Sequence, residues 1–342
     1  MILFGKHIDQ TIDSIDGRHE RETFVKEVVV TRGAVPLAMI RKRLARNGGG
    51  TKAVVLLVHG FGQNRYAWHL PSRSFANYLA KAGFDVFNLD LRGHGRSRHF
   101  GSHRSSSVSD YVEEDLPNAI EEIQQLAGKR PVFLVGHSLG GLVSYAAAPQ
   151  LNGAVAGVAS FGSPYHFGRG STSLTAIATF VKMVNVLRLK PNPPVPLKPV
   201  GLTMFAFRAL AESPLYPVPW RGWHRGSMEP HVLHEHLKLA FDRAGLAELA
   251  ELFEWAAQKR FGGRERDYGE RFEKLDLPLL VVSGTHDDLA PPEGVQPAFA
   301  RSTSSDKTYR SLPLGHIDLL VGREAPKTAW PMLAQWISGR AA

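Results

Sequence analysis

The sequence predicts an α/β protein with a mostly parallel, doubly wound sheet, an N-terminal antiparallel edge and an inserted, mainly helical cap. Apolar strand-like runs alternate with helix-like stretches over residues 53–164, which is typical of parallel strands joined by helices on both faces. The strand pattern stops over residues 165–272 and returns at residue 277. We therefore expect a core made of residues 1–164 and 273–342, with residues 165–272 as the cap.

Two strand-like segments precede the alternating region. Residues 23–31 and 35–44 flank Arg32-Gly33-Ala34 and predict an antiparallel hairpin at a sheet edge, where Pro36 is tolerated. Residues 1–22 are polar and are expected to lie over the surface. Residues 53–58 form a continuous apolar run, as expected of a central strand covered on both faces.

The remaining elements follow from apolar periodicity and from glycine or proline at their ends. In the first part of the core we expect helices at 74–82 and 110–126, strands at 85–90, 132–137 and 154–161, and an Ala-rich helix after Ser138. In the cap and beyond we expect a stiff connector at 191–199, a helix at 233–260, strands at 277–284 and 308–312, and a helix at 327–337.

Composition restricts the function classes. The 342 residues carry a net charge of +9 and no cysteine, which excludes disulfides, thiolate metal sites and a cysteine nucleophile. No nucleic-acid motif accompanies the charge, so we expect general surface solvation; the alternative is attraction of an anionic substrate or an anionic lipid surface. Residues 1–9 lack the features of a signal peptide, which favours the cytoplasm. These patterns do not predict the oligomeric state.

One stretch carries a catalytic motif. Gly136 and Gly140 flank Ser138 in the G-x-S-x-G spacing, between an apolar strand and a helix. This spacing suits a sharp turn that lifts a serine hydroxyl to the top of a sheet, beside a helix N-terminus that favours an oxyanion. A serine nucleophile also needs a base and a carboxylate that orients the base. Asp287 and Asp288 follow one later strand and His316 follows the last, in the order that such enzymes use.

The chain resembles the α/β-hydrolase superfamily from about Phe24 to the C-terminus. Four motifs carry the resemblance, namely His59-Gly60-Phe61-Gly62, Asp90-Leu91-Arg92-Gly93-His94-Gly95-Arg96-Ser97, Gly136-His137-Ser138-Leu139-Gly140 and Gly315-His316. Residues 68–76 and 82–86 and Asp115-Leu116-Pro117 are similar to the acid-lipase branch, although the disulfides of those lipases are absent. Parts of 228–342 resemble hydrolases near the polyhydroxyalkanoate synthases, which have cysteine where this chain has Ser138.

The resemblance implies a role for each site residue. Ser138 is the expected nucleophile, His316 the base, and an aspartate from positions 287 and 288 the orienting group. The family's G-x-x-D-x-x-x-P spacing, from Gly284 to Pro291, selects Asp287 and leaves Asp288 in an exposed loop. The backbone amides of Phe61 and Leu139 are the expected oxyanion donors.

Weaker signals have two interpretations each. Arg92 and the basic loop after it either hold a turn or attract anionic groups, and His137 is expected to be a packed neighbour instead of a second base. The His231, His234 and His236 group lacks a metal-binding spacing, so no metal or other cofactor is expected. The cluster of Trp220 and Trp223 with Met204, Phe205 and Phe207 is either cap core or an acyl-binding wall.

These observations predict a serine carboxylic-ester hydrolase of lipase or esterase type that acts on a small-molecule or lipid ester with an apolar acyl group. The alternative is an acyltransferase that uses the same triad with an acceptor other than water. A non-catalytic interaction protein on the same fold is a third interpretation, which the complete set of Ser138, His316 and Asp287 disfavours.

Overall fold

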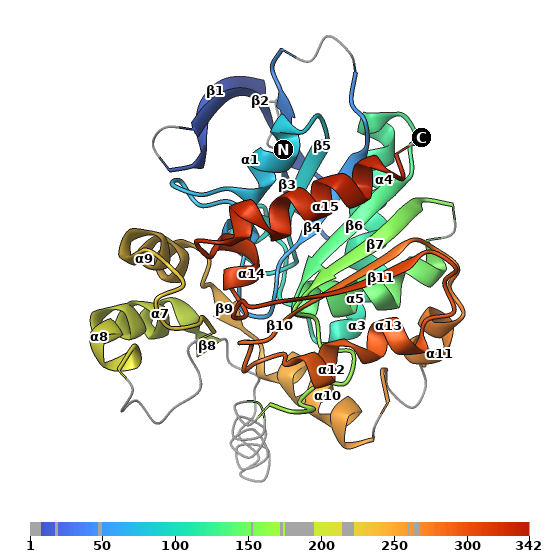
Figure 1. The fold of residues 1–342 in the computed structure, drawn as a ribbon. Helices are drawn as coiled ribbons and strands as arrows, with labels where there is room; N and C mark the ends of the chain where they lie inside the picture. The colour runs from blue at the N-terminus through green and yellow to red at the C-terminus, as the bar shows by residue number, and fades with distance from the viewer. Residues whose placement is uncertain are drawn as a thin grey trace.

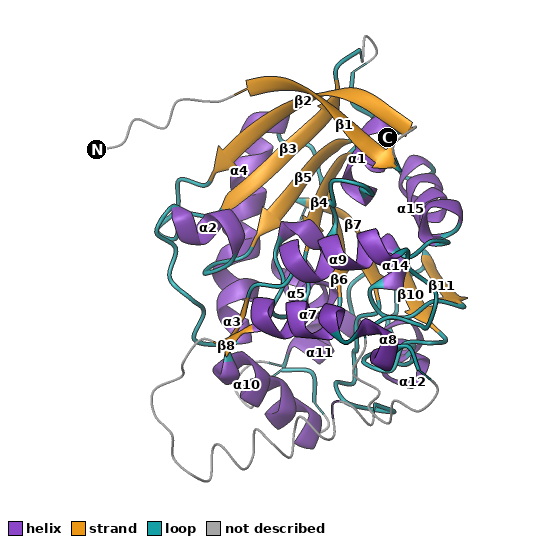
Figure 2. Ribbon diagram, turned by 90° about the vertical axis from the view of Figure 1, so that its left-hand side faces the viewer, coloured by secondary structure: helices purple, strands orange, loops and turns teal. Residues whose placement is uncertain are grey.

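The computed structural model describes residues 8–17, 20–46, 50–151, 153–171, 174, 195–213, 222–258, 260–262 and 267–341. A nine-stranded sheet runs through the molecule in the order β1-β2-β3-β5-β4-β6-β7-β10-β11 (Figures 1 and 2). Its strands are β1 (Ile8–Asp16), β2 (Glu20–Val30), β3 (Ala38–Leu44), β4 (Val54–Val58), β5 (Asp85–Asp90), β6 (Val132–His137), β7 (Val155–Phe161), β10 (Leu279–Gly284) and β11 (Lys307–Leu312). The first three strands and β5 pair antiparallel, and all later pairs are parallel.

Helices cover both faces of this sheet. They are α1 (Phe75–Lys81), α2 (Gly95–His99), α3 (Val108–Asp110), α4 (Leu116–Ala127), α5 (Leu139–Ala147), α11 (Tyr268–Glu273), α12 (Pro292–Val295), α13 (Pro297–Arg301), α14 (Asp318–Val321) and α15 (Ala329–Ser338). A π-helical turn, Tyr111–Asp115, joins α3 to α4, and short 3-10 turns lie at Arg65–Ala67, Ala148–Gln150 and Ala325–Lys327. The predicted mostly parallel sheet with helices on both faces is therefore confirmed.

The buried strands distribute their side chains between two cores. In β4, Val55 and Leu57 pack on the side of α1 and α15, whereas Val54, Leu56 and Val58 pack on the side of α4 and α5. This alternation is the period of two that a strand imposes, and it explains why residues 53–58 are apolar without interruption.

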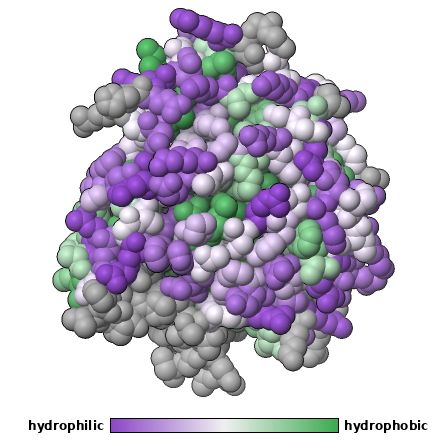
Figure 3. Space-filling view, viewed as in Figure 1, coloured by the Kyte–Doolittle hydropathy of each residue, from purple (hydrophilic) through white to green (hydrophobic). Residues whose placement is uncertain are grey.

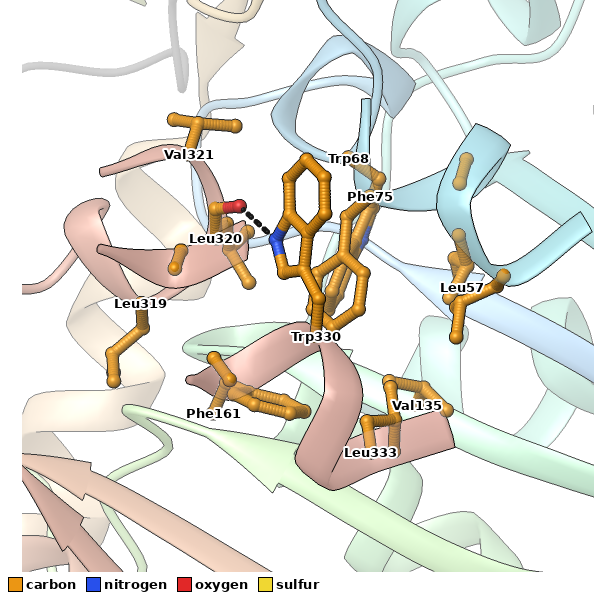
Figure 4. Packing of buried hydrophobic residues seen from close by; sticks show 14 of the residues in the cluster. Leu57, Trp68, Phe75, Val135, Phe161, Leu319, Leu320, Val321, Trp330 and Leu333 are labelled. Carbon is orange, nitrogen blue, oxygen red and sulfur yellow. Dashed lines mark hydrogen bonds between the residues drawn. The ribbon is translucent and has the colours of Figure 1, made fainter. Parts of the chain in front are cut away.

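Large aromatic rings fill the core beneath α15 (Figure 4). The ring of Trp330 stacks on that of Phe75 with centroids 5.2 Å apart, and its indole N–H donates to the Leu320 carbonyl at 2.8 Å. Phe161 meets Phe75 edge to face at 5.9 Å. These contacts attach α14 and α15 to the end of β7, next to the loop that follows β11.

The inserted segment contributes α7 (Leu197–Ala206), α8 (Arg208–Ala211), α9 (Pro230–Leu239) and α10 (Leu246–Ala257), with a two-stranded sheet of β8 (Val195–Pro196) and β9 (Arg243–Ala244). Figure 2 shows α7, α8 and α9 grouped together at one end of the parallel strands. Within the described residues, no helix combines the length and hydrophobicity needed to cross a lipid bilayer.

Three expectations need correction. Residues 8–16 lie at the surface as expected, but they form strand β1, and β1, not the 23–44 hairpin, is the edge of the sheet. The expected helix at 233–260 is two helices, because the chain leaves α9 at Ala240 and forms β9 before Gly245 caps α10. The predicted stiff connector at 191–199 is also wrong where the structure describes it, because residues 195–196 form β8 and residues 197–199 begin α7; residues 191–194 lie outside the described residues.

Candidate active site

Ser138 occupies a sharp turn between β6 and α5. Its backbone has φ 53° and ψ −121°, a conformation that costs free energy for a residue with a side chain. Both neighbouring glycines are sterically required. A Cβ on Gly136 would lie 2.3 Å from the Gly141 nitrogen, and one on Gly140 would lie 2.3 Å from the Val58 carbonyl oxygen. The turn is therefore the strand-to-helix elbow that the motif predicts.

His316 and Asp287 form a buried pair. The His316 Nδ1–H donates to Asp287 Oδ2 at 2.7 Å, and the other carboxylate oxygen accepts the backbone N–H groups of Leu289 and Ala290 at 2.9 and 2.7 Å. These bonds fix the carboxylate and leave Nε2 of His316 as the nitrogen that accepts a proton. Asp288 is exposed, so the structure directs Asp287, and not its neighbour, at the histidine.

The pair lies beside the serine turn. The Ser138 N–H donates to the Phe161 carbonyl at 2.9 Å. Gly162 follows Phe161, and a Cβ on this glycine would lie 3.1 Å from His316 Nδ1 and 3.0 Å from Asp287 Oδ2. Ser138, Asp287 and His316 thus follow the ends of β6, β10 and β11, on the same side of the sheet. Among the described residues, Ser138 Oγ makes no hydrogen bond to His316. Hydrogen bonds of this kind are often long without substrate and tighten in its complex.

His137 packs against the base. Its ring centroid lies 4.5 Å from that of His316, and its Nε2–H donates to the His316 carbonyl at 3.1 Å. Complete burial, together with His316, holds the pKa of His137 well below its usual value, so the ring is neutral. His137 is the packed neighbour that the sequence predicts, and it holds the backbone of the histidine loop.

Asp318 is a site-supporting residue that the sequence reasoning missed. It is fully buried, and its Oδ2 accepts the backbone N–H groups of Gly315 at 2.9 Å and His224 at 2.7 Å. These bonds fix the loop that carries His316 against the inserted segment, and burial raises the Asp318 pKa to about 6. The only signal in the sequence was its position two residues after His316.

The two expected oxyanion donors lie on the walls of one small hollow. Leu139 is the first residue of α5, so its N–H has no partner within the helix, and Phe61 lies in the loop after β4. The hollow is lined by His59, Gly60, Phe61, Gly62, Leu91, His94, Tyr111, Leu139, Gly245 and Glu248. Phe61 and Leu139 therefore lie close to each other, as the two donors of an oxyanion hole must.

His59 holds the loop that carries Phe61. Its Nε2 accepts the Leu91 N–H at 3.1 Å, so Nδ1 carries the proton and donates to the Gly60 carbonyl at 2.9 Å. Burial lowers the His59 pKa, which keeps the ring in this neutral form.

The inserted segment holds the same loop from the other side. The Asp242 N–H donates to the Gly62 carbonyl at 2.8 Å, and the Asp242 carboxylate accepts the Gly95 N–H at 2.7 Å and the Arg98 guanidinium at 2.6 Å. The Leu197 N–H donates to the Asp242 carbonyl at 2.8 Å. Asp242 therefore joins the oxyanion loop, the basic loop and the start of α7.

Several residues among the weaker signals have structural roles. Arg92 is buried and donates to Asp115 and Glu114 at 2.7 Å each, so it holds a turn. His236 is fully buried and burial lowers its pKa to about 3. No group of side chains suited to a metal ion occurs in the described part of the chain. Trp223 is buried in one of the two cores, and Met204 and Phe205 pack partly against it. Phe207 is exposed, so it does not belong to this core, and Trp220 lies outside the described residues.

Comparisons with known proteins agree with this geometry. Residues 53–323 match the model of the alpha/beta hydrolase fold family. The chain is 23% identical over 84% of its length to a poly(3-hydroxyalkanoate) polymerase subunit PhaC from Haloarcula marismortui, of which it spans 61%. That similarity extends well beyond residues 228–342, where the sequence analysis placed it.

Two lipases are also similar. Monoglyceride lipase from Rattus norvegicus is 24% identical over 88% of this chain and 87% of its own length. The crystal structure of a monoacylglycerol lipase from Paleococcus ferrophilus superimposes with a TM-score of 0.61 at 21% identity, covering 89% of this chain and 99% of that one. The family match covers most of the sheet and every residue of the candidate site, and the chain belongs to the α/β-hydrolase fold family.

Proposed function

We propose that this protein is a serine hydrolase of lipase or esterase type that cleaves carboxylic esters with an apolar acyl group through an acyl-enzyme. The observation that carries the proposal is the buried His316–Asp287 pair beside the Ser138 elbow. The monoglyceride lipase and monoacylglycerol lipase relatives support ester hydrolysis as the reaction.

In the proposed mechanism, Ser138 Oγ attacks the ester carbonyl carbon while His316 Nε2 accepts its proton. Asp287 holds the imidazole in the required tautomer and stabilises the imidazolium that forms. The negative charge on the carbonyl oxygen is stabilised by the N–H groups of Phe61 and Leu139, and by the N-terminus of α5.

The tetrahedral intermediate then collapses and its carbon–oxygen bond to the alcohol breaks. His316 returns the proton to the departing alcohol, leaving an ester between the acyl group and Ser138. The same histidine next removes a proton from water, and the water oxygen attacks the acyl carbon. The bond to Ser138 Oγ then breaks, His316 returns the proton to Oγ, and the carboxylic acid leaves. Residues 165–272 act as the cap over this site and control what reaches it.

Replacing the nucleophile tests the mechanism. Ser138→Ala is expected to lower kcat/KM for p-nitrophenyl butyrate by about 10⁴-fold or more, because no other group forms the acyl-enzyme. A fluorophosphonate probe should label the wild type at Ser138 and leave the variant unlabelled. Ser338→Ala, which alters an exposed serine on α15, is the matched control and should retain full activity. Full activity of Ser138→Ala would refute the proposal.

Acyl transfer to an acceptor other than water is a second candidate, favoured by the similarity to the polymerase subunit. The triad and the oxyanion hole would serve both reactions, so the products must distinguish them. If glycerol or a hydroxy acid ester captures most of the acyl group at a concentration far below that of water, transfer is the main reaction. If free carboxylic acid remains the main product, the protein is a hydrolase.

A further inference from the structure

Helix α9 buries a polar side chain that the proposed mechanism does not use. The outer face of this helix is mainly hydrophilic, as Figure 3 shows where Figure 1 places α9, and its inner face carries Val232, Leu233 and Leu237. His236 lies on the inner face and is fully buried. Burial of a polar group costs free energy unless the group is hydrogen-bonded, so the partner of His236 bears on why this position is polar.

The partner of His236 is the side chain of Gln63, which lies in the loop after β4 that carries Phe61. His236 Nε2 and Gln63 Nε2 are 3.4 Å apart, a long contact that burial of both side chains strengthens. Gln63 Oε1 accepts the Gly60 N–H at 3.2 Å, which fixes the orientation of the amide, because a backbone N–H can only donate. Gln63 Nε2–H is therefore the donor, and His236 Nε2 accepts.

This bond requires the neutral form of His236. A ring nitrogen that accepts a hydrogen bond carries no proton, so the proton is on Nδ1. Burial, with a smaller contribution from His316, lowers the pKa of His236 to about 3, so the ring stays neutral at pH 7 and well below it. Nδ1 makes no hydrogen bond within the described ranges, so the contact with Gln63 is the one that this ring makes there. His236 is therefore a constant acceptor.

Gln63 holds the peptide that carries one expected oxyanion donor. Its side chain accepts the Gly60 N–H, and its backbone N–H donates to the Gly60 carbonyl at 3.3 Å. The Gly60 carbonyl and the Phe61 N–H belong to one planar peptide group, so these two bonds restrict the direction of the Phe61 N–H. A Cβ on Gly60 would lie 2.9 Å from Gln63 Oε1 and 3.1 Å from Ser138 Cβ, so the Gln63 amide lies close to the nucleophile.

We propose that His236 is a positioning residue for the oxyanion hole and acts through Gln63. The ring accepts from the Gln63 amide, the amide holds the turn from Gly60 to Gln63, and this turn directs the Phe61 N–H at the developing oxyanion. Because His236 lies in the inserted segment, that segment contributes to the catalytic centre itself, beyond controlling access to it. The inference rests on the proposed reaction and adds a residue that supports its transition state.

Removing the acceptor tests the proposal. His236→Phe keeps a buried ring of similar size but cannot accept from Gln63. Its kcat for p-nitrophenyl butyrate should fall about tenfold with KM nearly unchanged, because the oxyanion forms only after the substrate has bound. His236→Gln offers an amide oxygen as the acceptor and should restore most of kcat. The matched control is His231→Phe, which makes the same change at an exposed histidine of α9 and should retain wild-type activity.

A double-mutant cycle shows whether His236 acts through Gln63. Gln63→Met removes both polar atoms of the amide at similar volume and should lower kcat by about tenfold or more. The variant Gln63→Met/His236→Phe should lose no more activity than Gln63→Met alone, because the acceptor has no effect once the donor is gone. Independent contributions would instead multiply the two losses.

Measurements without turnover separate this inference from the proposed reaction. Nitrogen NMR of the wild type should show the His236 ring in its neutral Nδ1–H form from about pH 5 to 8. Hydrogen exchange of the Gly60 amide should be faster in His236→Phe than in the wild type. If Ser138→Ala keeps full activity while these two results hold, the proposed reaction is wrong and the contact between His236 and Gln63 stands.

Four results would overturn the proposal. The first is a folded His236→Phe variant with kcat within about twofold of the wild type, and the second is a cycle in which the two losses multiply. The third is an Nε2–H form of His236 in the NMR spectrum. The fourth is a rise in KM at unchanged kcat, because the ring would then contact the substrate itself. If His236→Phe does not fold, Gln63→Met with wild-type kcat would overturn the proposal in its place.

Discussion

Gly140 offers the sharpest test of how the elbow builds the oxyanion hole. It is the third residue after the end of β6 and lies in the first turn of α5, where its backbone is helical and alanine would normally be favourable. In Gly140→Ala, however, the new Cβ would lie 2.3 Å from the Val58 carbonyl oxygen and 2.6 Å from that of His59. Both atoms are backbone, so neither can rotate away.

The size of the effect follows from these distances. The Cβ would be about 1 Å too close to the Val58 oxygen, so α5 must move away from the loop that begins at His59 by roughly that amount. Phe61 lies on that loop and Leu139 on α5, so the movement separates the two expected oxyanion donors. A displacement of about 1 Å in a catalytic group costs roughly 10²-fold in rate, and loss of one donor costs about 10²–10³-fold. Overpacking itself should lower the free energy of unfolding by about 1–3 kcal/mol.

The assay must separate catalysis from folding. We expect kcat/KM of Gly140→Ala for p-nitrophenyl butyrate to fall by about 10²-fold or more, while its circular dichroism spectrum stays native. The control is Gly339→Ala at the end of α15, where the nearest atom to the new Cβ is the Gln335 carbonyl oxygen at 3.5 Å. A correctly folded Gly140→Ala variant with activity within about twofold of the wild type would refute the reasoning, because the movement would then not reach the donors.

Three other changes have defined outcomes. Asp287→Asn should lower kcat by about 10³–10⁴-fold by disturbing the histidine tautomer, and Asp288→Asn should leave it near the wild-type value; equal losses in the two variants would contradict the assignment. In Asp318, burial raises the folded pKa from 3.8 to about 6, so the folded state holds its proton more tightly and wild-type stability falls as pH rises from about 4 to 6. Asp318→Asn should remove up to about 3 kcal/mol of this pH dependence from the free energy of unfolding, measured by urea denaturation. A variant with the same pH dependence as the wild type would show that Asp318 does not cause it. Trp330→Phe should lower the free energy of unfolding by about 1–3 kcal/mol through loss of its bond to Leu320 and of packing volume, with kcat unchanged; a large loss of kcat would show that the core contacts reach the site.

The sheet was predictable where both faces of a strand are buried. The continuous apolar run of β4 predicts a central strand buried on both faces, and each of its side chains does enter one of the two cores. Strand β1 was missed for the opposite reason. Of its nine residues only Ile15 is buried, so backbone pairing with β2 determines the strand and its side chains carry little signal.

In the candidate site, the features that could be predicted are those formed by residues near one another in the sequence or fixed by their order along it. The elbow is a contact between residues near in sequence, and the order of Ser138, Asp287 and His316 is a property of the chain itself. Contacts between distant residues were not predictable. Asp242 reaches Gly95 across 147 positions, and no spacing rule joins an acidic residue in the inserted segment to a glycine in the core. The polar groups that orient the catalytic loops belong mainly to this second kind.

The bonds of Asp242 have a consequence for protein engineering. Its backbone and side chain connect Gly62, Leu197 and Arg98, so the stretch from β8 to β9 cannot be exchanged as an independent module. A chimaera that imports this stretch from a relative must also import a residue that accepts from Arg98 and Gly95, or the loop beside the nucleophile loses its outer support. Grafts made at junctions that retain Asp242 and β9 should preserve turnover while changing which esters are accepted.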